Sequence, residues 1–222
     1  MQQNILTALI SKDFWQKLGH YVGLSGKPKR SAMTDFESLK KFIESRASHV
    51  SQTALYGYMK TRAGTRFPEM FEDPGMLMSI NIAKWQVWMS CVSDLTVYLG
   101  ALITQRSVHS AEDVSKMMGQ LAEEIVAGTG SPEDAGDNFE EARQSYIQRV
   151  RDSLLDRIAD DETAFSQSPA ALVKWSPIAD ELKVRDVEIV ENSMRFRWIE
   201  VRRSARELLD GDSIMSNYLS AD

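Results

Sequence analysis

Six polar residues in two segments of the chain are the best candidates for ligand chemistry. Asn81 and Lys84 interrupt a long apolar run, and the other four lie in an earlier basic, tyrosine-rich segment. The predicted ligand-binding residues are Arg46, His49, Gln52, Tyr56, Asn81 and Lys84. A cationic side chain withdrawn from water can bind a small anion, and a lysine of lowered pKa can act as a base. The alternative is structural: Lys84 is paired with an acid, or extends its stem to solvent, because an unpaired buried charge is costly.

The common catalytic signatures are absent from the sequence. The three histidines, His20, His49 and His109, have neither the H-x-x-x-H nor the E-x-x-H spacing of a helical metal site. No phosphate-binding loop and no G-x-S-x-G nucleophile elbow is present. We therefore predict no metal and no cofactor, no catalytic residue is assigned, and the sequence favours a non-catalytic protein.

The first 30 residues carry a different kind of candidate site. An apolar helical face containing Trp15 precedes the basic residues Lys27, Lys29 and Arg30. An amphipathic helix beside basic residues is typical of reversible attachment to an anionic membrane surface. The alternative is that this helix packs on the rest of the protein and the basic residues form a solvated loop.

Charge is distributed unevenly along the chain. The first 70 residues hold eleven Lys/Arg and five Asp/Glu, whereas the remainder holds fifteen and twenty-seven, and the net charge is −6. The acidic balance and the lack of a recognised module argue against nucleic-acid binding. The single cysteine, Cys91, cannot form an intramolecular disulfide, and the N-terminus lacks the features of a signal peptide. We expect a cytoplasmic protein, with membrane association through residues 1–30 as a further expectation.

The elements that position these residues are predicted to be helices. The run 74–105 is apolar on nearly every side of a helical wheel, with Trp85 and Trp88 among its large residues. A helix of this kind is buried on nearly all sides. We predict an all-α protein, a single domain over 1–222, with about six to seven helices in an irregular bundle around this central helix.

Capping residues, prolines and glycines in the sequence predict where the helices begin and end. Thr34 with Glu37 predicts a capping box for a helix that runs to about Arg62, and Asp73 before a proline predicts the start of the central helix. Ser110 is expected to cap the next helix, which stops at Gly128. A charged helix is expected over 137–160 and a last helix up to about residue 209, with a buried seam formed by Val187, Val190, Met194, Trp198, Val201, Ala205 and Leu208.

Three stretches resemble segments of an uncharacterised family of helical bacterial proteins: LYGYMKTRAGTRFPEMF, NIAKWQVWMSCVSDL and ENSMRFRWIEVRRSARELL. The resemblance implies an all-helical fold. Members of such families sometimes carry the label "esterase", but no residue here can be matched to an esterase nucleophile, base or oxyanion hole.

These observations lead to two functional expectations. The first is a non-catalytic helical interaction or assembly factor, peripheral to a membrane or free in the cytoplasm. Its expected contact surfaces are the exposed side of the last helix and the basic, tyrosine-rich segment between Arg46 and Arg66. Its expected partner is a protein, and a homodimer is a second expectation. The alternative is a small esterase-like hydrolase or an anionic-ligand-binding protein with its site between the second and central helices.

Overall fold

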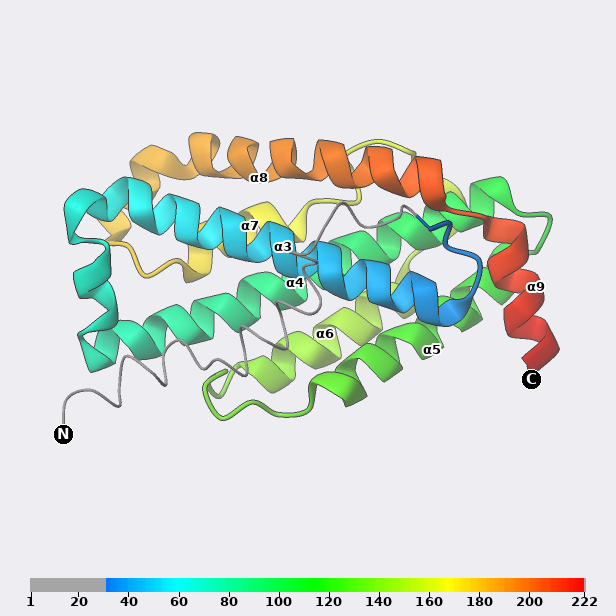
Figure 1. Ribbon diagram of the computed structural model, residues 1–222, viewed down its shortest axis with the longest axis horizontal. Coiled ribbons are helices and arrows are strands. Elements are labelled where there is room, and N and C mark those ends of the chain that lie inside the picture. Colours follow the sequence, from blue (N-terminus) through cyan, green and yellow to red (C-terminus); the bar gives the residue numbers. More distant parts are fainter. Residues whose placement is uncertain (1–30, 222) are drawn as a thin grey trace. The chain divides into compact units, whose positions relative to one another are not determined.

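The computed structural model describes residues 31–221, and within them the protein is all-α (Figure 1). Trp15, Lys27, Lys29 and Arg30 lie outside the described residues. The helices are α3 (Phe36–Ala63), α4 (Pro74–Arg106), α5 (Ala111–Thr129), α6 (Phe139–Asp152), α7 (Gln167–Trp175), α8 (Asp180–Leu208) and α9 (Gly211–Ala221). Short 3-10 helices occur at Gly64–Arg66, Pro68–Phe71 and Leu155–Arg157.

The central helix is α4, as its apolar circumference predicts. It packs against α3, α5, α6, α7 and α9, and every residue from Cys91 to Ile103 is buried. Among the described helices, α4 alone is long and apolar enough to cross a membrane, with a mean hydropathy of 1.4 over its most apolar window. Because 83% of that window is buried inside the protein, the composition is explained by packing in a helical core.

The N-terminal part of α4 is less buried than the wheel predicts. Met78 is 65% exposed. Trp85 and Trp88 are half-buried, and their indole N–H groups donate to Asp134 and Ser48 across distances of 2.7 and 3.0 Å. An indole carries a polar N–H as well as an apolar body, so both tryptophans lie at the edge of the core.

Helix starts follow the predicted capping chemistry with one correction. Asp73 accepts a hydrogen bond from the Met76 amide, and Ser110 accepts one from the Asp113 amide, as expected. The capping box of α3 is shifted by one residue, because Asp35 caps the Ser38 amide and the Ser38 hydroxyl accepts from the Asp35 amide. A carboxylate is as good a cap as a hydroxyl, so either register satisfies the sequence pattern.

The charged helix is shorter than predicted, since α6 ends at Asp152. Leu155 is buried against Gly100 of α4, where a Cβ atom would lie 3.1 Å from the Leu155 methyl groups. This close approach turns the chain across α4, and the preceding residue, Leu154, is 57% exposed. The last helix is also interrupted. The chain leaves α8 after Leu208, Leu209 forms a bridge with Met33, and a separate helix α9 follows.

Candidate functional site

Lys84 is part of a cluster centred on the Asp134 carboxylate. The Lys84 ammonium lies 2.8 Å from Asp134 Oδ2 and 3.4 Å from Asn81 Oδ1, while Trp85 Nε1 donates to Asp134 Oδ1. The ammonium also lies 5.0 Å from the centroid of the Trp85 ring. With its side chain 12% exposed, Lys84 is a paired charge stacked on an aromatic ring.

The six predicted ligand-binding residues fall into two groups. Asn81 and Lys84 surround Asp134. Burial, and after it the charge of Asp134, raises the pKa of Tyr56. Arg46 stacks over Phe42 elsewhere on α3, and His49 reaches the surface nearby. Gln52 is half-buried on the same helix.

Arg197 of α8 joins the Arg46 group. Partial burial and the positive charges of Arg46 and Arg197 lower the pKa of His49. The lowered pKa keeps His49 neutral at pH 7, so the group owes its positive charge to its two arginines.

Lys84→Met tests whether the Lys84 ammonium is structural. Because methionine keeps the apolar stem over Trp85 and Asp134 is 42% exposed, we expect the free energy of unfolding to change by less than about 1 kcal/mol. Urea denaturation of the variant beside the parent protein measures this. A loss of several kcal/mol would show that the ammonium contributes more than an edge ion pair.

The most deeply buried charge is Asp94, which lies on α4 and is fully buried. Its Oδ1 accepts a hydrogen bond from Arg149 of α6 at 2.6 Å, and its Oδ2 accepts the Ser168 amide at 2.7 Å, where α7 begins. Burial raises the pKa of Asp94, and the Arg149 charge and the Ser168 bonds oppose that rise. The arrangement connects α4, α6 and α7 and has no open side for a ligand.

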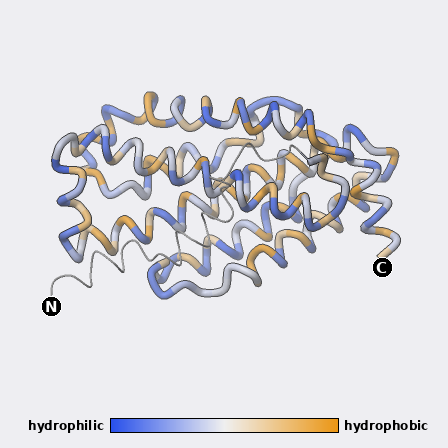
Figure 2. Tube along the Cα trace, viewed as in Figure 1, coloured by the Kyte–Doolittle hydropathy of each residue, from blue (hydrophilic) through white to orange (hydrophobic). Residues whose placement is uncertain are grey.

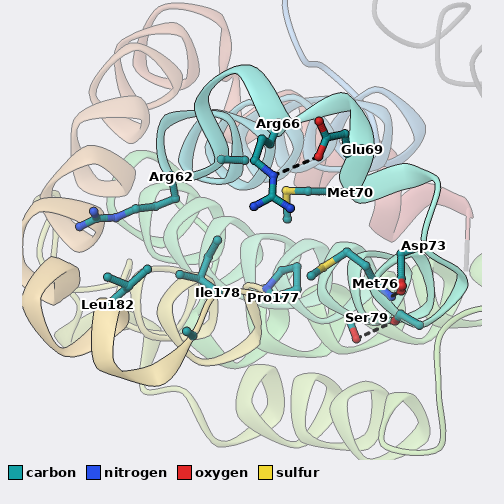
Figure 3. A pocket seen from close by; sticks show the side chains of 13 residues that line it. Arg62, Arg66, Glu69, Met70, Asp73, Met76, Ser79, Pro177, Ile178 and Leu182 are labelled. Atoms are coloured by element: carbon teal, nitrogen blue, oxygen red, sulfur yellow. Dashed lines mark hydrogen bonds and ion pairs between the residues drawn. The ribbon is translucent and has the colours of Figure 1, made fainter.

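A pocket of about 550 Å³ lies beside the last turns of α3 and the first turns of α4 and α8. Figure 3 shows an apolar row, Leu182, Ile178, Pro177 and Met76, with Arg66 and Glu69 on the other side. Its two arginines are already paired: Arg66 Nε lies 3.0 Å from Glu69, and Arg62 binds Asp186. The pocket is therefore apolar along one side, with its charges neutralised at the rim.

The outer side of α8 carries large apolar residues with no covering element in the described part of the protein. Four of them, Leu182, Ile189, Phe196 and Ile199, are 38%, 72%, 73% and 55% exposed and are here called the α8 stripe. The opposite face of α8, including Val190 and Trp198, is buried against α3 and α7. Figures 1 and 2 show α8 at the edge of the described helices, with apolar positions recurring along it.

Two further apolar side chains of α8 are exposed. Val187, predicted to belong to the buried seam, is 38% exposed, and Val184 is 77% exposed. The seam therefore begins at Val190. Leu182 belongs both to the α8 stripe and to the pocket, so the two apolar surfaces are continuous.

Comparison with known proteins gives no relative. No protein family, no curated protein and no solved structure matches the chain. Within residues 31–221, no group of three or more His, Cys, Asp or Glu side chains is arranged to hold a metal ion.

Proposed function

We propose that the protein is a non-catalytic interaction factor whose contact surface is the α8 stripe with the adjoining pocket. The observation that carries the proposal is the exposure of Ile189 and Phe196, at 72% and 73%, on a helix whose other face is fully packed. Large apolar side chains gathered along one exposed face are typical of protein interaction sites. Burying one such side chain contributes about 1.5–3 kcal/mol to association before the entropic costs.

The competing proposal, an esterase-like or anion-binding site between α3 and α4, has less support. The Lys84 ammonium is bound to Asp134, and the arginines of the pocket are bound to Asp186 and Glu69. An anionic ligand would have to displace these carboxylates. The apolar side of the pocket fits a partner's apolar side chains better than it fits a small anion.

Cross-linking inside the producing cell tests the proposed surface. With a photoreactive phenylalanine analogue in place of Phe196, irradiation is expected to attach a discrete protein to α8. The matched control is the same analogue at Val108, which is 89% exposed in the turn between α4 and α5. Adducts of equal yield at both positions, or none at Phe196, would contradict the proposal.

A further inference from the structure

We infer that the partner of the α8 stripe is a second copy of this chain, with the two α8 helices packed side by side and antiparallel. This inference rests on the proposed function and names its partner. Three features of α8 support it: the spacing of the apolar residues, the charges beside them and the position of Arg185.

The spacing is that of a helix that pairs along its length. Leu182, Ile189 and Phe196 are separated by seven residues each, and Ile199 follows Phe196 by three. A seven-residue repeat keeps an apolar row facing one neighbouring helix, as in coiled coils. A contact with a loop or a lipid surface does not require this repeat.

The charged residues that flank the apolar row of one copy are complementary to those of a second copy only when the two α8 helices are antiparallel. The residues that precede Leu182, Ile189 and Phe196 are Glu181, Glu188 and Arg195, also seven apart, with the acids first and the base last. In an antiparallel pair these positions face one another across the interface. Glu188 then faces Arg195 of the second copy, and this contact occurs twice in each dimer.

Glu188 and Arg195 are both accessible for such pairing. Glu188 is exposed and forms no ion pair within residues 31–221. Arg195 has a side chain that is 40% exposed and contacts Glu191 on its own helix at 2.9 Å. A second carboxylate can approach the same guanidinium, which has five N–H donors.

Arg185 excludes the parallel alternative. Arg185, Asn192 and Ile199 form a second row of residues seven apart, next to the row of Leu182, Ile189 and Phe196. A parallel pair would therefore place Arg185 against Arg185 of the second copy. Like charges in direct opposition are unfavourable. In the antiparallel pair, Arg185 instead lies beside Phe196 of the second copy, where a guanidinium can stack on the ring.

Sedimentation velocity of the purified full chain tests self-association. We expect the sedimentation coefficient to rise from the monomer value to the dimer value with increasing concentration. Ile189→Asp should remain monomeric over the same range, while the control Val108→Asp should dimerise like the parent. Circular dichroism and thermal melting show whether each variant is folded. A folded parent that stays monomeric, or an Ile189→Asp protein that dimerises normally, would overturn the inference.

Charge reversal tests the contact between the flanking residues. Glu188→Arg and Arg195→Glu are each expected to weaken dimerisation about tenfold, because two attractive pairs become repulsive. The double variant should return to within about threefold of the parent, and an equal loss in the double variant would contradict the antiparallel contact.

Engineered disulfides test the direction of the two helices. In the antiparallel pair, Leu182 lies beside Ile199 of the second copy. Mixing Leu182→Cys with Ile199→Cys should therefore give a mixed disulfide, whereas parallel pairing would give only the two like-with-like products. Cys91, the one native cysteine, is buried. A monomeric protein that still cross-links to a different protein through position 196 would end this inference and leave the proposed function standing.

Discussion

Arg149→Met is expected to lower the free energy of unfolding by about 3–5 kcal/mol, because it leaves the buried Asp94 carboxylate without its cation. Arg149 also donates hydrogen bonds to Ser93 Oγ at 2.9 Å and to the Ala164 carbonyl at 2.8 Å. The substitution therefore removes three bonds that join α6 to α4 and to the chain before α7. Chemical denaturation at pH 7 measures the loss.

A matched surface variant and a pH series separate this effect from the loss of any arginine on α6. Arg151→Met removes a partner of Glu123 whose side chain is about half exposed, and should cost less than about 1 kcal/mol. Without Arg149, the pKa of Asp94 in the folded state rises further above its unfolded value of 3.8.

The folded Arg149→Met protein then binds a proton more readily than the unfolded chain. Its deficit relative to the parent should shrink as the pH falls through that raised pKa, and should level off once Asp94 is also protonated in the folded parent. If the difference in free energy of unfolding did not depend on pH, the loss in Arg149→Met would not come from an uncompensated Asp94 carboxylate.

The all-α architecture could be predicted because α4 and its caps leave strong local signals. A helix apolar on all sides has to be central, and Asp73 and Ser110 cap the helices that they precede in sequence. The early end of α6 could not be predicted in this way. It depends on Leu155 fitting against Gly100, 55 positions away in the sequence, and no local pattern contains that contact.

The candidate site shows the same limit. Asp94 stands out in the sequence as a charge in an apolar run, but its partner Arg149 is one of many arginines and only the fold selects it. The sequence predicts a contact surface on the exposed side of the last helix, and this stays a prediction. The residues exposed on that side could not be predicted. Val187 and Val190 both fit the helical spacing of the buried seam, and the fold buries only Val190.

Trp198→Ala is expected to cost about 3–5 kcal/mol, since it empties the volume of the largest fully buried side chain among the described residues. The indole lies 4.7 Å from the Phe165 ring between centroids, and its Nε1 donates to Ser168 Oγ at 3.0 Å. Ser168 is also the residue whose amide binds Asp94. Trp198 therefore joins α8 to the buried polar network around Asp94.

Two companion variants show which part of the indole matters. Trp198→Phe keeps most of the ring contact with Phe165 and loses the bond to Ser168, so it should cost less than the alanine variant. Trp85→Ala removes a half-buried indole at the edge of the core and should cost about 1–2 kcal/mol. Thermal and urea unfolding rank the three proteins. If Trp85→Ala were the most damaging, the core would be centred on the first half of α4 and not on the contact between α4, α7 and α8.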